Sequence, residues 1–99
     1  MSDRVTVFAS FHPTEEAGEA FLELMAMMVE NTRQEPGCET YDLYADAAGG
    51  YHLFEIYSND TALQAHRDAA HYKEYRAAVV DMLDGDIGVV VLSAIDAAR

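Results

Sequence analysis

The first stretch of the chain alternates between two sets of side chains with the period of a β-strand. Val5, Val7, Ala9 and Phe11 form one set, and the residues between them form the other. Side chains of a strand point alternately to opposite faces, so the pattern predicts a strand with one face on a core. Pro13 is expected to end this strand, because proline has no N–H to donate to a neighbouring strand.

From Thr14 onward the apolar positions recur every three or four residues. The recurring set is Ala17, Phe21, Leu24, Met25, Met28 and Thr32, and glutamates occupy the other side. This spacing predicts an amphipathic helix, with Thr14 as its N-cap. Glu35-Pro36-Gly37 is expected to end the helix, because the residue before proline avoids the helical region and glycine permits a reversal of the chain.

Two further alternating stretches, residues 38–46 and 51–58, flank a small-residue turn at 47–50. Together they predict a β-hairpin. In its second strand Glu55 shares a face with Leu53, so a carboxylate is expected in the middle of an otherwise apolar face.

A second helical region is expected to follow, capped by Asn59 or Asp60, with His66 on its apolar side. The pattern predicts an irregularity near residues 68–71. Apolar positions then continue at helical spacing as far as Leu83, so the helix is expected to resume after the irregularity.

Residues 87–95 are almost wholly β-branched or aliphatic and predict a last strand. The chain is therefore expected to form one α+β domain, residues 1–99, with the ferredoxin-like order βαββαβ and two helices on one face of an antiparallel sheet. Both alternating sets of the last strand are apolar, and Phe8 and Phe54 are apolar on the side opposite the core. Exposed apolar patches of that extent usually mark interfaces, so we predict a homodimer in which two sheets pack face to face.

The charge of the chain excludes several classes of partner. Six basic residues stand against eighteen acidic ones, which gives a net charge of −12, and protonating all four histidines would still leave −8. Binding to nucleic acid or to an anionic membrane surface requires a basic face. The expected partners are therefore small or neutral.

The cytoplasm is the predicted location. The first eleven residues lack the regions of a signal peptide, and the apolar runs fall far short of the roughly 20 residues that span a bilayer. The single cysteine, Cys38, cannot form an internal disulfide, which fits a reducing compartment.

Glu55 and His66 are the candidate acid–base residues. Burial would raise the pKa of Glu55 toward neutrality, although a structural, hydrogen-bonded glutamate fits the pattern equally well. His66 suits general-base catalysis near pH 7, but a lone histidine on an apolar face also serves as a packing residue. His71 follows five residues later, which on a regular helix turns it about 140° away. A metal site with both histidines is therefore not expected unless the helix breaks between them.

The six tyrosines of the chain could line a pocket for a flat substrate, or simply fill the core. Arg76 lies among them in the sequence, where it could hold an anionic oxygen or pair with Glu74 or Asp81. No nucleotide, flavin or hydrolase motif is present in the sequence. An enzyme with this sequence is expected to work without a cofactor.

Several short motifs follow one another along the chain: Glu35-Pro36-Gly37-Cys38, Tyr41-Asp42-Leu43-Tyr44, Phe54-Glu55-Ile56-Tyr57, Ala65-His66 and His71-Tyr72. In their order and spacing they resemble the antibiotic biosynthesis monooxygenase domain family, and especially its small quinol monooxygenases. The resemblance runs from about Val5 to Ile95. It implies a dimeric α+β barrel built from ferredoxin-like protomers.

The resemblance implies oxidation of an electron-rich phenol or hydroquinone by O2, without metal or flavin. Such a reaction requires a base that forms the substrate anion and a dry pocket that protects the peroxide intermediate. The implied base is His66, with Glu55 orienting it or sharing its proton. The expected pocket residues are Tyr41, Tyr57, His71, Tyr72 and Arg76.

Two other functions remain open at this point. The same motifs resemble a phospho-autoinducer isomerase of this family, which would move a proton along a dione and use an arginine such as Arg76 for the phosphate. A dimeric barrel that binds a small hydrophobic ligand without catalysis is the third possibility. Haem oxygenation is not expected, because haem-degrading relatives carry a tryptophan and this chain has none.

Overall fold

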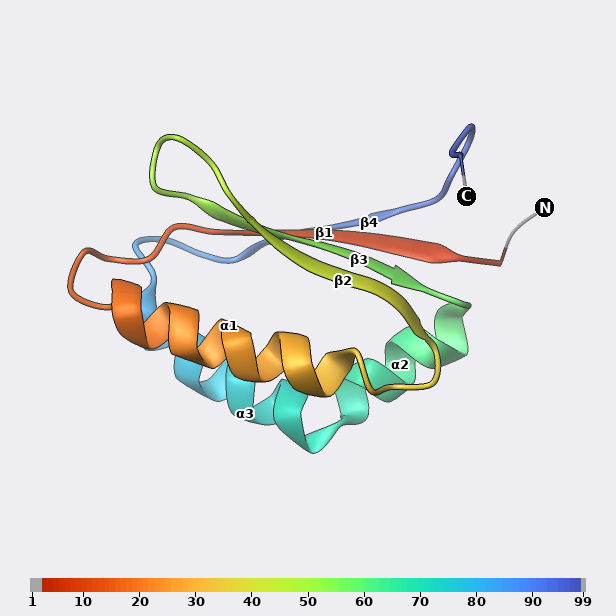
Figure 1. The fold of residues 1–99 in the computed structure, drawn as a ribbon, viewed down its shortest axis with the longest axis horizontal. Helices are drawn as coiled ribbons and strands as arrows, with labels where there is room; N and C mark the ends of the chain where they lie inside the picture. Colours follow the sequence, from red (N-terminus) through yellow and green to blue (C-terminus); the bar gives the residue numbers. More distant parts are fainter. Residues whose placement is uncertain (1–2, 99) are drawn as a thin grey trace.

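Three helices cover one face of a four-stranded antiparallel sheet in the computed structural model, which describes residues 3–98 (Figure 1). The strands are β1 (Val5–Phe11), β2 (Cys38–Ala45), β3 (Tyr51–Tyr57) and β4 (Gly88–Leu92). The helices are α1 (Gly18–Thr32), α2 (Asp60–Asp68) and α3 (Ala70–Val79), and a 3₁₀ turn, η1 (Val80–Met82), follows α3. Met1, Ser2 and Arg99 belong to the predicted domain 1–99 but lie outside the described residues.

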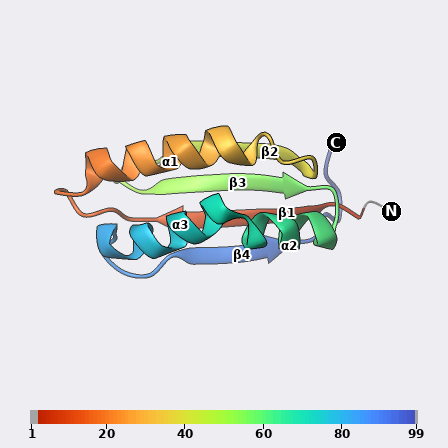
Figure 2. The same cartoon turned by 90° about the horizontal axis from the view of Figure 1, so that it is seen from below.

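The strand order β2-β3-β1-β4 is that of a ferredoxin-like unit, so the predicted α+β fold is confirmed. Seen from the helix side, α1 runs along the β2–β3 half of the sheet, and α2 and α3 run along the β1–β4 half (Figure 2). The core lies between the two layers. Its most buried side chains include Phe21, Met25, Met28, Tyr41, Leu53 and Val79.

The alternation predicted for β1 is confirmed, and in β3 the predicted set Leu53, Glu55 and Tyr57 is buried, although Ile56 of the opposite set is also only 1% exposed. Val5, Val7, Ala9 and Phe11 are all buried against the helices. Glu55 is directly opposite Val7 in the β1–β3 ladder and is only 5% exposed. The strand pattern therefore places a carboxylate inside the molecule.

The first helix starts later than the sequence predicts, at Gly18 instead of after Thr14. The Thr14 hydroxyl accepts the backbone N–H of Ala17 within a turn, at 3.3 Å. The backbone N–H of Thr14 donates to the carbonyl of Met82 at 2.9 Å, and Pro13 forms a β-bridge with Leu83. This pairing holds both segments extended, which delays α1 and keeps Leu83 out of the helix predicted there.

The second helical region is interrupted as the sequence predicts. The Asn59 side chain caps α2 by accepting the backbone N–H of Ala62 at 2.8 Å. At Ala69 the backbone turns extended, with ψ at 147°, and α3 begins at the next residue. The helix axis therefore changes between His66 and His71, the condition under which the two imidazoles can meet.

The outer face of the sheet, opposite the helices, is apolar and exposed. The last strand is shorter than the predicted 87–95, because it pairs with β1 only from Gly88 to Leu92. Phe8, on β1, lies opposite Phe54 on β3 and Val90 on β4. Phe8 is 38% exposed and Val90 52% exposed. This exposed apolar patch is what the predicted dimer would cover. Among the described helices, none has the length and hydropathy needed to cross a membrane.

Candidate active site

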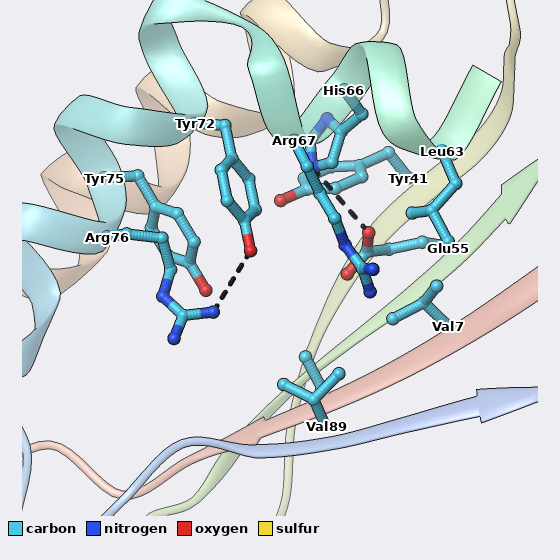
Figure 3. A pocket seen from close by; sticks show the side chains of 11 residues that line it. Val7, Tyr41, Glu55, Leu63, His66, Arg67, Tyr72, Tyr75, Arg76 and Val89 are labelled. Carbon is cyan, nitrogen blue, oxygen red and sulfur yellow. Dashed lines mark hydrogen bonds and ion pairs between the residues drawn. The ribbon is translucent and has the colours of Figure 1, made fainter. Parts of the chain in front are cut away.

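A small cavity of about 20 Å³ lies between the sheet and the α2–α3 pair (Figure 3). Strand β1 contributes Val7 to its lining, β3 contributes Glu55, and the helices contribute His66 and Tyr72. The volume is room for about one ordered water molecule. The cavity therefore brings the two predicted acid–base residues together.

Glu55 is held inside the cavity as a group that exchanges protons near neutral pH. Burial raises the pKa of its carboxyl from 4.5 to about 7, and the hydrogen bond from Tyr57 works against this rise. The Tyr57 hydroxyl donates to Oε1 of Glu55 at 2.6 Å. A carboxyl group with a pKa near neutrality can both give and take a proton at physiological pH.

His66 is 2% exposed and is held by a carboxylate other than the expected one. Its Nδ1 lies 2.8 Å from Oε2 of Glu35, whereas its Nε2 lies 4.0 Å from Oε1 of Glu55. A carboxylate only accepts hydrogen bonds, so Nδ1–H donates to Glu35 and Nε2 keeps a lone pair on the Glu55 side. Burial lowers the pKa of His66, which the hydrogen bond to Glu35 opposes. The result is an oriented, neutral imidazole.

Glu35 reaches α2 because the turn after α1 packs closely against it. A Cβ atom on Gly37 would overlap the side chain of Ala62, so only glycine permits this approach. The backbone N–H of Ser58, at the end of β3, donates to the Gly37 carbonyl at 2.9 Å. These contacts anchor the turn that carries Glu35 against the first turn of α2.

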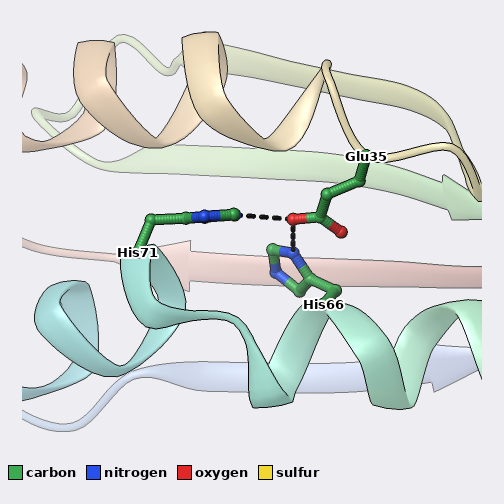
Figure 4. A group of neighbouring side chains, drawn as sticks. All are labelled: Glu35, His66 and His71. Atoms are coloured by element: carbon green, nitrogen blue, oxygen red, sulfur yellow. Dashed lines mark hydrogen bonds and ion pairs between the residues drawn. The ribbon is translucent and has the colours of Figure 1, made fainter.

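The break between α2 and α3 brings His71 to the same carboxylate (Figure 4). Nε2 of His71 lies 2.6 Å from Oε2 of Glu35, the oxygen that also bonds to His66. Ligand atoms of all three side chains lie within 4.8 Å of one another. A continuous helix would hold His66 and His71 apart, but the helix breaks between them. The reason for excluding a metal site with both histidines therefore no longer holds.

Three tyrosine rings surround His66. The ring centroids of Tyr41, Tyr57 and Tyr72 lie 5.8, 5.2 and 5.0 Å from that of the imidazole. Burial raises the pKa of the Tyr41 and Tyr57 phenols, so both remain protonated and can donate hydrogen bonds. The imidazole is thus packed on several sides by rings that limit its rotation.

Arg76 donates to the Tyr72 hydroxyl at 3.1 Å, and its guanidinium carbon lies 5.9 Å from the centroid of that ring. The sequence offered Glu74 and Asp81 as its partners, but the geometry favours Tyr72. Arg67 of α2 also lines the cavity. Two guanidinium groups therefore accompany the acid–base residues.

The predicted site residues divide into two groups. Tyr41, Glu55, His66, Tyr72 and Arg76 line the cavity, whereas Tyr57 and His71 do not: Tyr57 hydrogen-bonds Glu55, and the ring of His71 lies 6.0 Å from that of His66. Sequence reasoning missed Glu35 and Arg67 as site residues. Glu35 was expected only to end a helix, and its place in the Glu35-Pro36-Gly37-Cys38 motif was the one signal that pointed further.

Comparison with known proteins identifies the family. The family model described as antibiotic biosynthesis monooxygenase matches residues 4–78. The chain belongs to the antibiotic biosynthesis monooxygenase family. The resemblance inferred from the motifs is thereby confirmed.

Relatives within this family match almost the whole chain. "Putative monooxygenase Rv0793" of Mycobacterium tuberculosis (strain ATCC 25618 / H37Rv) is 42% identical over 99 residues, covering 99% of this chain and 98% of the relative. The solved structure of Rv0793 has a TM-score of 0.94 at 41% identity and covers 97% of this chain and 99% of its own.

Two further structures carry the same fold. One described as an antibiotic biosynthesis monooxygenase is 30% identical, with a TM-score of 0.87 over 93% of this chain and 99% of its own. A protein of Nitrosomonas europaea is 24% identical, with a TM-score of 0.89 over 96% of this chain and 93% of its own, a likeness of fold alone. The family match and the names of these relatives support a monooxygenase-like fold.

Proposed function

We propose that this chain is a cofactor-independent monooxygenase that oxidises a small phenol or hydroquinone with O2, with His66 as the general base. The observation that carries the proposal is the orientation of His66. Its Nδ1 is engaged by Glu35 at 2.8 Å, and its Nε2 is left on the side of the buried carboxyl of Glu55. A base with one nitrogen fixed and the other available is what proton removal from a bound phenol requires.

The chemistry balances with O2 as the only co-reactant. His66 Nε2 takes the phenolic proton, and the resulting anion gives an electron to O2, which the neutral phenol does far less readily. Recombination of the two radicals forms a carbon-bound peroxide, and loss of water from it leaves a quinone when the substrate is a phenol and a hydroxylated quinone when it is a hydroquinone. One oxygen atom enters the product, the other leaves as water, and the substrate supplies all the electrons.

Glu55 is proposed as the second proton carrier. Its pKa of about 7 lets it take the proton from His66 and return it to the peroxide as water leaves. The 4.0 Å between Nε2 of His66 and Oε1 of Glu55 is bridged by a small movement or by one water molecule. Tyr57 holds the carboxyl in place during this exchange.

Substrate binding must enlarge the cavity. Small-molecule pockets usually measure about 300 Å³ or more, and the cavity here is about 20 Å³. Arg76 and Val89 are the exposed members of its lining, so the side on which they lie is the proposed entrance. Movement of the Arg76 side chain away from Tyr72 would open space beside the base.

We also propose that the protein acts as a homodimer through its outer sheet face. Val90 and Leu92 of β4, which lie opposite Phe8 and Thr6 of β1 on the outer face, are each at least 44% exposed. Two sheets that pack face to face would remove this apolar area from water.

The isomerase alternative has one observation in its favour. Arg67 and Arg76 both line the cavity, and two guanidinium groups suit a phosphorylated dione better than a neutral quinol. Proton exchange at a dione carbon without O2 consumption would support that reading. Ligand binding without either activity would support a non-catalytic barrel.

The test is oxygen consumption with a panel of hydroquinones and phenols. We expect turnover by the unmodified chain and a loss of at least 100-fold in His66→Ala, because general-base catalysis contributes about 10²–10⁴-fold. His12→Ala is the matched control, because the exposed His12 follows β1 and does not line the cavity, and we expect this variant to leave turnover unchanged. Full turnover in a folded His66→Ala protein would refute the role of His66, and no oxygen uptake with any substrate would refute the reaction.

A further inference from the structure

We propose that Glu35, His66 and His71 form a binding site for one divalent transition-metal ion, with Zn²⁺ the best fit. The site combines two imidazole nitrogens with one carboxylate oxygen, and these three ligand atoms lie within 4.8 Å of one another. Imidazole and carboxylate are typical zinc ligands, and three protein ligands with one open position are the usual set of a catalytic-type zinc site. Sites with nitrogen ligands also bind Zn²⁺ more tightly than Fe²⁺ or Mn²⁺.

The geometry needs only a small expansion to accept the ion. Oε2 of Glu35 lies 2.8 Å from Nδ1 of His66 and 2.6 Å from Nε2 of His71. Ligands around a tetrahedral zinc ion stand about 2.1 Å from the metal, and therefore roughly 3.4 Å from each other. The carboxylate oxygen must withdraw from each nitrogen by less than an ångström, and the two nitrogens, which lie within 4.8 Å of each other, must come to a similar separation.

The three ligands come from three separate segments (Figure 4). Glu35 follows α1, His66 lies in α2, and His71 lies in the first turn of α3. The backbone break at Ala69 and the close approach of Gly37 to Ala62 are both needed to bring them together. An ion held here would therefore cross-link the helical layer.

Surroundings of the cluster also suit a metal site. Metal-bound histidines commonly direct their second nitrogen at a carboxylate, and Nε2 of His66 lies 4.0 Å from Oε1 of Glu55. The His71 side chain is 19% exposed, which leaves a route for the ion, and the net charge of −12 attracts cations. The outer-face pair of His52 and Asp46 offers a contrast, because its third neighbour is the hydroxyl of Ser10.

This proposal stands apart from the oxidation proposed above, which needs no metal. Both use His66, so the metal-free and the metal-loaded chain are different forms of the same site. A binding measurement therefore tests the metal site whether or not the chain consumes oxygen.

Equilibrium dialysis against Zn²⁺, with metal content measured by atomic emission, is the direct test. We expect one zinc ion per chain at micromolar concentrations and none retained with Mg²⁺, which prefers oxygen ligands. Glu35→Gln and His71→Ala are each expected to weaken zinc binding at least tenfold. His52→Ala and Cys38→Ser are the controls and are expected to bind zinc like the unmodified chain.

A second readout does not depend on the folding of any variant. Co²⁺ bound by two nitrogens and an oxygen in a four-coordinate site gives the unmodified chain a visible absorption band, which zinc should abolish by competition. If the chain takes up no zinc and shows no such band with Co²⁺, then Glu35, His66 and His71 form only a hydrogen-bonded cluster, and the proposal is overturned. Zinc binding that persists undiminished in folded Glu35→Gln and His71→Ala proteins would overturn it as well.

Discussion

On each side of the sheet a histidine pairs with a carboxylate, and the two pairs have nearly equal N···O distances. His66 and Glu35 are joined at 2.8 Å on the helix-covered face, and His52 and Asp46 at 2.7 Å at the outer face. Their exposure differs greatly. The side chains of the inner pair are 3% and 15% exposed, and those of the outer pair are 28% and 42% exposed.

Because their burial differs, these two histidine–carboxylate pairs have different effects on the pKa values of their members. On the inner face burial lowers the pKa of His66, and no bulk water competes for its nitrogens. On the outer face the hydrogen bond from His52, with those from the Gly50 and Ala48 backbone, lowers the pKa of Asp46 to about 2. That pair holds the β2–β3 turn together. Distance alone therefore does not tell a reactive pair from a structural one, because the surrounding dielectric decides.

Truncation of the inner core should have the largest effect. Phe21 is fully buried and contacts the rings of Phe11 and Tyr51, with centroids 5.4 and 5.1 Å away. We expect Phe21→Ala to lower the free energy of unfolding by about 3–5 kcal/mol, measured by urea denaturation at fixed protein concentration. Val90→Ala, on the outer face, is the control and should change the stability of the isolated chain by far less. Equal losses of unfolding free energy in Phe21→Ala and Val90→Ala would contradict the distinction between a buried inner face and an exposed outer face.

A charge on the outer face should act on association rather than on folding. Val90 is 52% exposed in the single chain, so Val90→Asp places its carboxylate in water there. In the proposed dimer the same carboxylate would be buried without a partner, at a penalty of several kcal/mol. We expect at least a 100-fold increase in the dimer dissociation constant by analytical ultracentrifugation, with an unchanged circular dichroism spectrum. A chain that is already monomeric before substitution would refute the dimer.

Replacement of the buried carboxyl should change how stability depends on pH. The pKa of Glu55 is about 7 in the folded chain and 4.5 in the reference state, so the folded chain holds the proton more tightly. The contribution of Glu55 to stability is therefore fully present below about pH 4.5 and is lost as the pH rises through 7, by about 3 kcal/mol. Relative to the unmodified chain, Glu55→Gln should gain this amount between pH 4.5 and 8, measured by urea denaturation.

Asp46→Asn is the outer-face counterpart of that experiment, and it should have the smaller effect and the opposite sign. The pKa of Asp46 is lowered from 3.8 to about 2, so its contribution is present above pH 4 and is lost as the pH falls through 2. The variant should be less stable than the unmodified chain above pH 4, and the difference should disappear as the pH falls below 2. If the stability of Glu55→Gln and of Asp46→Asn, each relative to the unmodified chain, changed with pH in the same way, burial would not be what distinguishes the two carboxyl groups.

The parts of the fold that follow from short-range pattern were predictable. Alternation in residues 5–11 and 51–57 places one set of side chains on a core, and the structure buries that set. Asn59 caps the second helical region, and the chain breaks within the predicted 68–71. These features depend on backbone geometry and on neighbours within a few residues, which a single sequence contains.

Errors arose where distant segments meet. The late start of α1 and the extended Leu83 both result from the pairing of Pro13 with Leu83, two residues far apart in the sequence. Glu35 was missed for the same reason, since its partners His66 and His71 lie 31 and 36 residues away. Local patterns carry no information on such contacts.

By itself the sequence determined the order of the elements, the sign and size of the charge, and the presence of Glu55 and His66 on apolar faces. Only the tertiary structure decided which carboxylate holds His66 and that His71 shares it. The physical reason is that hydrogen bonds between side chains require atoms within about 3 Å. That proximity is set by the packing of Gly37 against Ala62 and by the break at Ala69, which together place three segments around one carboxylate oxygen.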